Sequence, residues 1–146
     1  MSERFKIHIA AYLVLEKDGE ILFHQRKNSG YMDGYYSLVA GHLDGAETAK
    51  QAIIREAHEE TGIVLRQEDL QVAHVSHRFN PHREYIDIYL TASKWEGEIT
   101  NMEPHKCDGL DWFPKDDLPE NIVPEVKAVL EKIQHKNFYS DIGFTQ

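Results

Sequence analysis

The sequence predicts an α/β fold with several strands and two amphipathic helices, built as a single domain over residues 1–146. Apolar residues recur at helical spacing of three and four positions within residues 48–62 and again within residues 121–133. The remaining apolar segments are rich in β-branched and aromatic residues and are bounded by turn residues, which is typical of strands. Because 146 residues without repeats or a linker-like segment match the length of one domain, we expect a single hydrophobic core region.

The N-terminal part is predicted to form strands. The first strand is apolar on both faces, which indicates a central position in a covered sheet, and Asp18-Gly19 after it is a hairpin signal. In chain order, the predicted elements are a strand over 5–16, a return strand over 21–26, a loop over 27–34, a short strand over 35–39 and a loop over 40–47.

The first helix has signals at both ends. Thr48 and Gln51 have the spacing of a capping box, and Gly62 stands where a left-handed C-terminal cap belongs. We therefore expect the helix to begin just after Thr48 and to end just before Gly62.

Three glutamates of this helix lie on one face. Glu56, Glu59 and Glu60 stand at i, i+3 and i+4, and a helical projection places them beside the apolar stripe instead of opposite it. Like charges at this spacing destabilise a helix by roughly 0.2–0.5 kcal/mol per pair. A bound divalent cation would offset that repulsion, so the cluster indicates a metal site.

The second half is predicted to alternate strands with loops before the second helix. The predicted elements are strands over 72–79 and 84–92 with a turn at 80–82, a polar loop over 97–106, a strand over 109–113 and a helix that begins between 121 and 124. In the strand over 84–92, one set of alternating residues is expected to face the core and the other to form an amphipathic face: Ile86, Ile88 and Leu90 against Tyr85, Asp87 and Tyr89.

The net charge and the cysteine content limit the kinds of partner and of cross-link that the chain can have. The chain has 16 basic and 25 acidic residues, a net charge of −9, which argues against nonspecific binding of nucleic acid or of a membrane surface. Cys107 is the single cysteine, so no intrachain disulfide forms. We see no signal peptide and no apolar run long enough to span a membrane, and we expect a cytoplasmic protein with a small-molecule partner.

The segment from Gly41 to Ile63 resembles the signature of the Nudix hydrolases, the Nudix box. In that signature a glycine, five residues, a glutamate and seven residues precede Arg-Glu-aliphatic-x-Glu-Glu-x-Gly-aliphatic. Ala57 stands where a larger aliphatic residue is usual, and the preceding segment lacks the proline-glycine-glycine of many members. The matching residues are Gly41, Glu47, Arg55, Glu56, Glu59, Glu60, Gly62 and Ile63.

The resemblance implies an α/β/α sandwich with a mixed central sheet, and a site that holds Mg²⁺ or Mn²⁺. Glu56, Glu59 and Glu60 are then the metal ligands, the Gly41 carbonyl adds a ligand, and Glu47 is an auxiliary ligand or a loop anchor. Arg55 would orient a glutamate by a two-point ion pair. Glu56, Arg55 and Glu59 are the expected catalytic residues. The general base is either Glu56 or a residue of a later loop, and the sequence leaves both open.

Substrate contacts are expected outside the helix. Arg26 is a candidate phosphate clamp at the end of a strand, and His42 is a second candidate beside Gly41. Aromatic side chains are candidates for stacking on a base: Tyr31, Tyr36, Phe79 and Tyr89.

The resemblance implies a hydrolase of a nucleoside diphosphate linked to another group. We favour a nucleoside or deoxynucleoside triphosphate, cleaved to monophosphate and pyrophosphate. The alternatives are an ADP-ribose or nucleotide-sugar pyrophosphatase, and a nucleotide-binding module without catalysis. An isoprenoid diphosphate isomerase of the same fold would need a cysteine before the box, whereas Cys107 lies after it. A homodimer is an assembly that the sequence leaves open.

Overall fold

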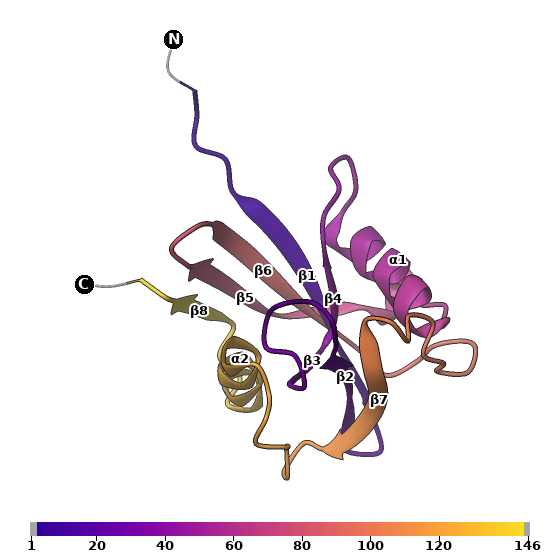
Figure 1. Cartoon of the computed structure of the whole chain (residues 1–146). Coiled ribbons are helices and arrows are strands. Elements are labelled where there is room, and N and C mark those ends of the chain that lie inside the picture. Colours follow the sequence, from indigo (N-terminus) through magenta and orange to yellow (C-terminus); the bar gives the residue numbers. More distant parts are fainter. Residues whose placement is uncertain (1–2, 145–146) are drawn as a thin grey trace.

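The computed structural model describes residues 3–144, so the two residues at each end of the predicted domain lie outside the described part. Figure 1 shows a strongly twisted sheet with a helix on either side. The elements are β1 (His8–Lys17), β2 (Glu20–Arg26), β3 (Tyr36–Ser37), β4 (Val39–His42), α1 (Ala49–Thr61), the 3₁₀-helix η1 (Gln67–Asp69), β5 (Gln71–Phe79), β6 (Glu84–Ala92), β7 (Cys107–Pro114), α2 (Pro124–Gln134) and β8 (Tyr139–Ile142).

The sheet is mixed, as predicted. Its main path runs β3-β2-β1-β6-β5-β8, with β4 paired to β1 and β7 paired to β2. Strand β1 is parallel to β6, and β5 is parallel to β8, whereas the other pairs are antiparallel. The central position predicted for the first strand is confirmed, because β1 contacts β2, β4 and β6.

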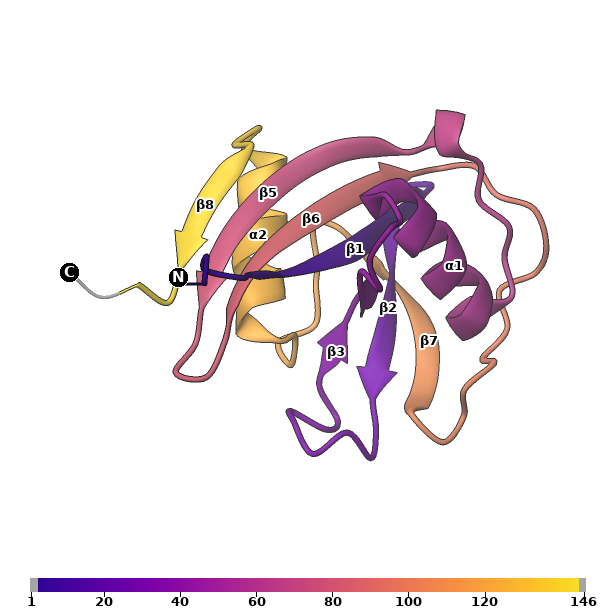
Figure 2. The same cartoon turned by 90° about the horizontal axis from the view of Figure 1, so that it is seen from above.

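The two helices cover opposite faces of β1, and Figure 2 shows them on either side of the sheet. Leu13 and Leu15 of β1 pack with Ile53 of α1, whereas Val14 packs with Val129 of α2. Alternate side chains of one strand therefore enter two separate apolar clusters. This arrangement is the predicted α/β/α sandwich.

The predicted caps of α1 are present. The Thr48 hydroxyl accepts a hydrogen bond from the Gln51 amide at 3.0 Å, and the Gln51 side chain accepts one from the Thr48 amide at 2.9 Å. Gly62 ends the helix with φ of 78°, in the left-handed region. Neither α1 nor α2, the two α-helices of residues 3–144, has the length and apolarity of a membrane-crossing helix.

Two expectations need correction. Residues 40–42 were predicted as loop, but they belong to β4, because Gly41 and His42 pair with Ala11 and Ala10 of β1. The supposedly amphipathic face of β6 is buried, including Asp87, since α2 covers that side of the sheet.

One strand, β8, lies in a segment for which the sequence supported no prediction. It pairs in parallel with β5, and the buried His74 ring of β5 lies 2.9 Å from the Asn137 carbonyl and 2.8 Å from the Ser140 hydroxyl. These contacts fasten the end of the chain to the sheet.

Candidate active site

A cavity of about 650 Å³ opens where β1, β4, the β5–β6 hairpin and the start of α2 meet. Gly41, Glu60 and His24 line its box side, the part beside the Nudix-like segment. Arg78 and Glu125 belong to the part formed by β5 and α2. The segment that the sequence singled out therefore forms one wall of a ligand-sized cavity.

Glu60 is the most buried carboxylate of the box. Its side chain is 10% exposed, and His24 Nδ1 lies 3.3 Å from Oε1. The other oxygen, Oε2, is buried without a hydrogen-bond partner among the described residues. Burial raises the pKa of Glu60 to about 7, with His24 acting against the rise and Glu56 adding to it. A buried oxygen without a partner is rare, and a catalytic role or a bound water or ion accounts for such cases.

Glu56 lies against the backbone of Gly41. A Cβ atom at position 41 would collide with the Glu56 side chain, so glycine leaves the space that this carboxylate occupies beside β4. Glu56 also accepts a hydrogen bond from Arg55 Nη1 at 2.7 Å. The glycine and the glutamate of the signature are thus in direct contact.

Arg55 connects the remaining carboxylates of the box. Its Nη2 and Nε donate to the two oxygens of Glu47 at 2.9 and 3.4 Å, the two-point pair that the resemblance implied. This hydrogen bonding lowers the pKa of Glu47. Glu47 also accepts from the Asp44 amide at 2.9 Å, which anchors the loop before α1. Glu59 is 52% exposed and lies 3.7 Å from Arg55.

The donor set fits a divalent cation, although no three acidic, histidine or cysteine side chains within residues 3–144 stand ready as a preformed metal site. Arg55 forms ion pairs with Glu47 and Glu56. The unpartnered Glu60 oxygen and the neighbouring Glu56 are hard oxygen donors, which Mg²⁺ and Mn²⁺ prefer.

The predicted substrate contacts divide into two groups. Arg26 and His42 line the cavity. Tyr36 and Phe79 do not: the Tyr36 hydroxyl donates to Asp111 at 3.1 Å, and the Phe79 ring packs against Phe144 with centroids 5.6 Å apart.

Several cavity residues were not singled out from the sequence. His24 lies beside Glu60, and Tyr12, Arg78, Tyr85 and Glu125 line the rest of the wall. The sequence held one signal for this part of the wall. Asp87 is a charged residue in a mostly apolar strand, and it forms an ion pair with Arg78 of the neighbouring strand.

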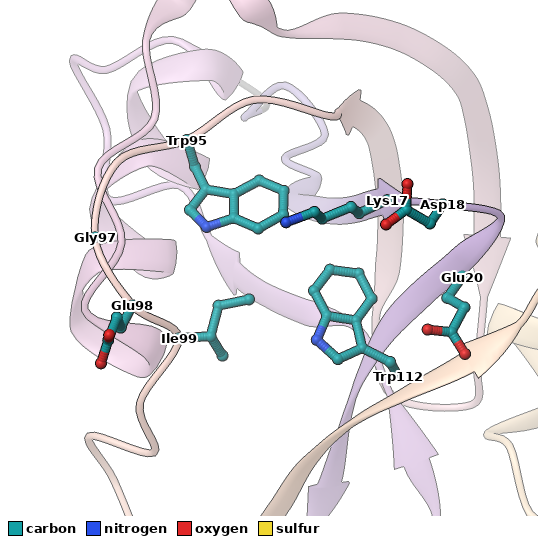
Figure 3. Close-up of a pocket in the computed structure, with 8 residues that line it drawn as sticks. All are labelled: Lys17, Asp18, Glu20, Trp95, Gly97, Glu98, Ile99 and Trp112. Atoms are coloured by element: carbon teal, nitrogen blue, oxygen red, sulfur yellow. The ribbon is translucent and has the colours of Figure 1, made fainter.

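A second cavity, of about 350 Å³, lies away from the box. Figure 3 shows Trp95, Trp112 and Ile99 in its wall, with Lys17 directed at the Trp95 ring. Because no residue of the Nudix-like segment lines it, we do not assign the reaction to this cavity.

The family to which the chain belongs and the names of its relatives show an enzyme that hydrolyses phosphoanhydride bonds. The chain belongs to the Nudix family, since the profile of the NUDIX domain matches residues 4–133.

Curated relatives of the chain carry different activities in their names. An 8-oxo-dGTP diphosphatase of Proteus vulgaris is 33% identical over 70% of this chain and 90% of its own length. An ADP-ribose pyrophosphatase of Methanocaldococcus jannaschii is 27% identical over 85% of this chain and 72% of its own. The NAD-capped RNA hydrolase NudC of Photorhabdus laumondii is 26% identical over 90% of this chain, which spans 48% of that protein.

Solved structures share the fold. The MutT NUDIX hydrolase from Burkholderia pseudomallei matches 87% of this chain and 98% of its own, with a TM-score of 0.79 and 26% identity. The MutT protein from Methanosarcina mazei matches 92% of this chain and 98% of its own, with a TM-score of 0.76. At 19% identity the second similarity supports the fold alone.

Proposed function

We propose that this hydrolase needs a divalent cation and cleaves a nucleoside or deoxynucleoside triphosphate to the monophosphate and pyrophosphate. The observation that carries the metal requirement is the buried, unpartnered Glu60 oxygen beside Glu56 in the wall of the cavity. Similarity to the 8-oxo-dGTP diphosphatase of Proteus vulgaris supports the triphosphate as substrate.

In this proposal Glu56 and Glu60 hold the metal together with the Gly41 carbonyl, and Glu59 and Glu47 are further ligands. The cation would neutralise phosphoryl oxygens and lower the pKa of a bound water. Arg55 keeps Glu47 and Glu56 in place through its hydrogen bonds.

Phosphate binding falls to the cationic and polar side chains of the cavity wall. Arg26 is fixed by hydrogen bonds from its guanidinium to the Tyr31 carbonyl at 2.7 Å and the Ser29 hydroxyl at 3.1 Å. With His42 it can position phosphate oxygens for attack by water, which is the main contribution a protein makes to phosphoryl transfer.

The second candidate is hydrolysis of ADP-ribose or a nucleotide sugar. Similarity to the ADP-ribose pyrophosphatase of Methanocaldococcus jannaschii supports it over a longer stretch of this chain, 85% against 70%. The same carboxylates would serve both reactions, so the box itself does not separate them.

A substrate panel tests these proposals. The eight common nucleoside and deoxynucleoside triphosphates, 8-oxo-dGTP, ADP-ribose and a nucleotide sugar are each incubated with Mg²⁺, with Mn²⁺ and with EDTA. The monophosphate, sugar phosphate, pyrophosphate and phosphate that form are then quantified by anion-exchange chromatography. We expect a triphosphate to yield its monophosphate and pyrophosphate, and only when metal is present. Activity that persists in EDTA would overturn the metal requirement, and cleavage of ADP-ribose alone would favour the second candidate.

A further inference from the structure

Arg78 forms a flat, rigid surface in the cavity wall. Its Nε and Nη2 donate to the two carboxylate oxygens of Asp87 at 2.6 and 3.1 Å. The guanidinium carbon lies 4.0 Å from the centre of the Tyr85 ring. We call Arg78, Asp87 and Tyr85 the Arg78 shelf. Because Tyr85 covers one face of the guanidinium and Arg78 lines the cavity, the other face is the one available to a ligand.

The charge around the shelf does not suit a phosphate. Asp87, only 2% exposed, neutralises Arg78. Glu125, in the first turn of α2, adds a second carboxylate to the same cavity and accepts a hydrogen bond from the Tyr31 hydroxyl at 3.2 Å. Asp87 and Glu125 therefore leave the Arg78 side of the cavity without net positive charge, and we expect the phosphate groups on the side of Arg26 and His42 instead.

The shelf is also hard to explain as a stabilising device. A buried ion pair often contributes no more to stability than apolar residues of similar volume, because removing both charges from water offsets their attraction. The positions paired with Asp87 in the two neighbouring strands are Ala10 and Ser76, and neither of them is charged. A charged pair at this place is better accounted for by a ligand that uses it.

We propose that the Arg78 shelf and Glu125 bind the nucleobase of the substrate, and that Glu125 favours bases with an exocyclic amino group. This inference rests on the proposed function and adds the residues that select the substrate. The guanidinium stacks on the face of the base, as arginine does in nucleotide recognition. The Glu125 carboxylate accepts a hydrogen bond from the amino group of adenine, cytosine or guanine. Uracil and thymine instead flank their single ring N–H with two carbonyl oxygens, which the carboxylate repels.

Binding of product monophosphates in EDTA tests the role of Glu125 without catalysis. Isothermal titration calorimetry would compare GMP with IMP, which lacks only the 2-amino group, and AMP and CMP with UMP. A hydrogen bond to a charged group contributes about 1.5–3 kcal/mol, so we expect wild type to bind at least one amino-bearing monophosphate about tenfold or more tightly than IMP and UMP. Glu125→Ala should abolish that preference, and Glu131→Ala, at an exposed position of the same helix, should retain it.

Ribose 5-phosphate tests which part of the substrate the shelf holds. Arg78→Lys keeps the charge but removes the planar fork. We expect this variant to weaken binding of nucleoside monophosphates about tenfold or more and to leave ribose 5-phosphate unchanged.

Three results would overturn the proposal: equal weakening of ribose 5-phosphate by Arg78→Lys, equal binding of all monophosphates by wild type, or a base preference that survives Glu125→Ala. These failures are separate from failure of the proposed function, because an enzyme that hydrolyses triphosphates with Mg²⁺ can still lack this base site. A hydrolysis panel without any activity would overturn the proposed function instead.

Discussion

Glu60 combines two properties that conflict in the metal-free protein: it is a carboxylate, and one of its oxygens is buried without a partner. Burying an ionised group without compensation is unfavourable, and the neighbouring Glu56 adds repulsion. The unfavourable environment is removed if a cation binds there. Removal of the charge of Glu60 should therefore stabilise the metal-free protein and weaken metal binding, and both effects can be measured.

We expect Glu60→Gln to stabilise the metal-free protein by about 0.5–1 kcal/mol, which corresponds to a rise in Tm of roughly 1–4 °C. Added Mg²⁺ should raise the Tm of wild type by mass action and that of the variant less. Thermal melts in EDTA and in Mg²⁺ measure both effects. Glu59→Gln is the matched control, because Glu59 is 52% exposed and its substitution in EDTA should change little. A Glu60→Gln protein less stable than wild type in EDTA would contradict the role of this residue.

Glu56→Gln should lower kcat by about 100-fold or more, because the amide keeps the hydrogen bond from Arg55 but cannot serve as an anionic ligand or base. Initial rates on the best substrate of the panel, together with a melt that shows the variant is folded, measure this. A variant with more than a tenth of the wild-type kcat would exclude Glu56 from both roles.

The single cysteine is expected to be unreactive in the folded protein. Cys107 is buried, and burial raises the pKa of its thiol. At a given pH near 8 the folded state therefore has less thiolate than an exposed cysteine, and thiolate is the reactive form. Iodoacetamide labelling followed by mass spectrometry should be slow in buffer and fast in denaturant. Rapid labelling of the native enzyme would show that the thiol is accessible, and loss of activity in Cys107→Ser would indicate a role in the reaction.

The sequence predicted the box residues because they are local. Glu56 and Glu60 lie one turn apart on one helix, so a helical projection brings them together without knowledge of the fold. Arg78, Asp87 and Glu125 come from three elements, and their meeting depends on strand pairing and on where α2 packs. Tyr36 is aromatic, as stacking requires, but the face of the strand on which it lies is set by pairing with β2.

At the scale of elements, the close approach of β4 to α1 determines the shape of the box. The sequence predicted the caps of α1 because Thr48, Gln51 and Gly62 act within a few residues of one another. It did not predict that residues 40–42 extend a strand, since that depends on pairing with β1, some thirty residues earlier. Likewise β8 becomes a strand only where β5 offers it a partner.

Gly41→Ala tests this approach. The added methyl group would collide with the Glu56 side chain, whose outer end can move, whereas φ at this position is not one that demands glycine. We therefore expect kcat to fall about tenfold or more, because Glu56 is displaced, while Tm changes little. Paired measurements of kcat and Tm check this. A variant that keeps full activity would show that Glu56 tolerates displacement.

At the scale of the whole molecule, β1 separates two apolar clusters, and the candidate active site lies at one end of this central strand. The fold class and the two covering helices were predictable, because they follow from apolar periodicity along the chain. The order of the strands was not, because it depends on pairings between distant segments, such as the parallel pair of β1 and β6. The wall of the substrate cavity could not be predicted for the same reason, since it is assembled from both halves of the sheet.

The two tryptophans of the chain lie together at one place in the fold. Trp95 and Trp112 stack with ring centres 5.9 Å apart, Lys17 lies 5.6 Å from the centre of the Trp95 ring, and neither indole lines the candidate active site. Their emission should therefore report how the segment after β6 packs on β7. We expect nucleotide titrations to leave tryptophan emission unchanged and denaturant to shift it to longer wavelength. Tryptophan emission, excited selectively at the red edge of its absorption, then follows unfolding and does not report occupancy of the active site.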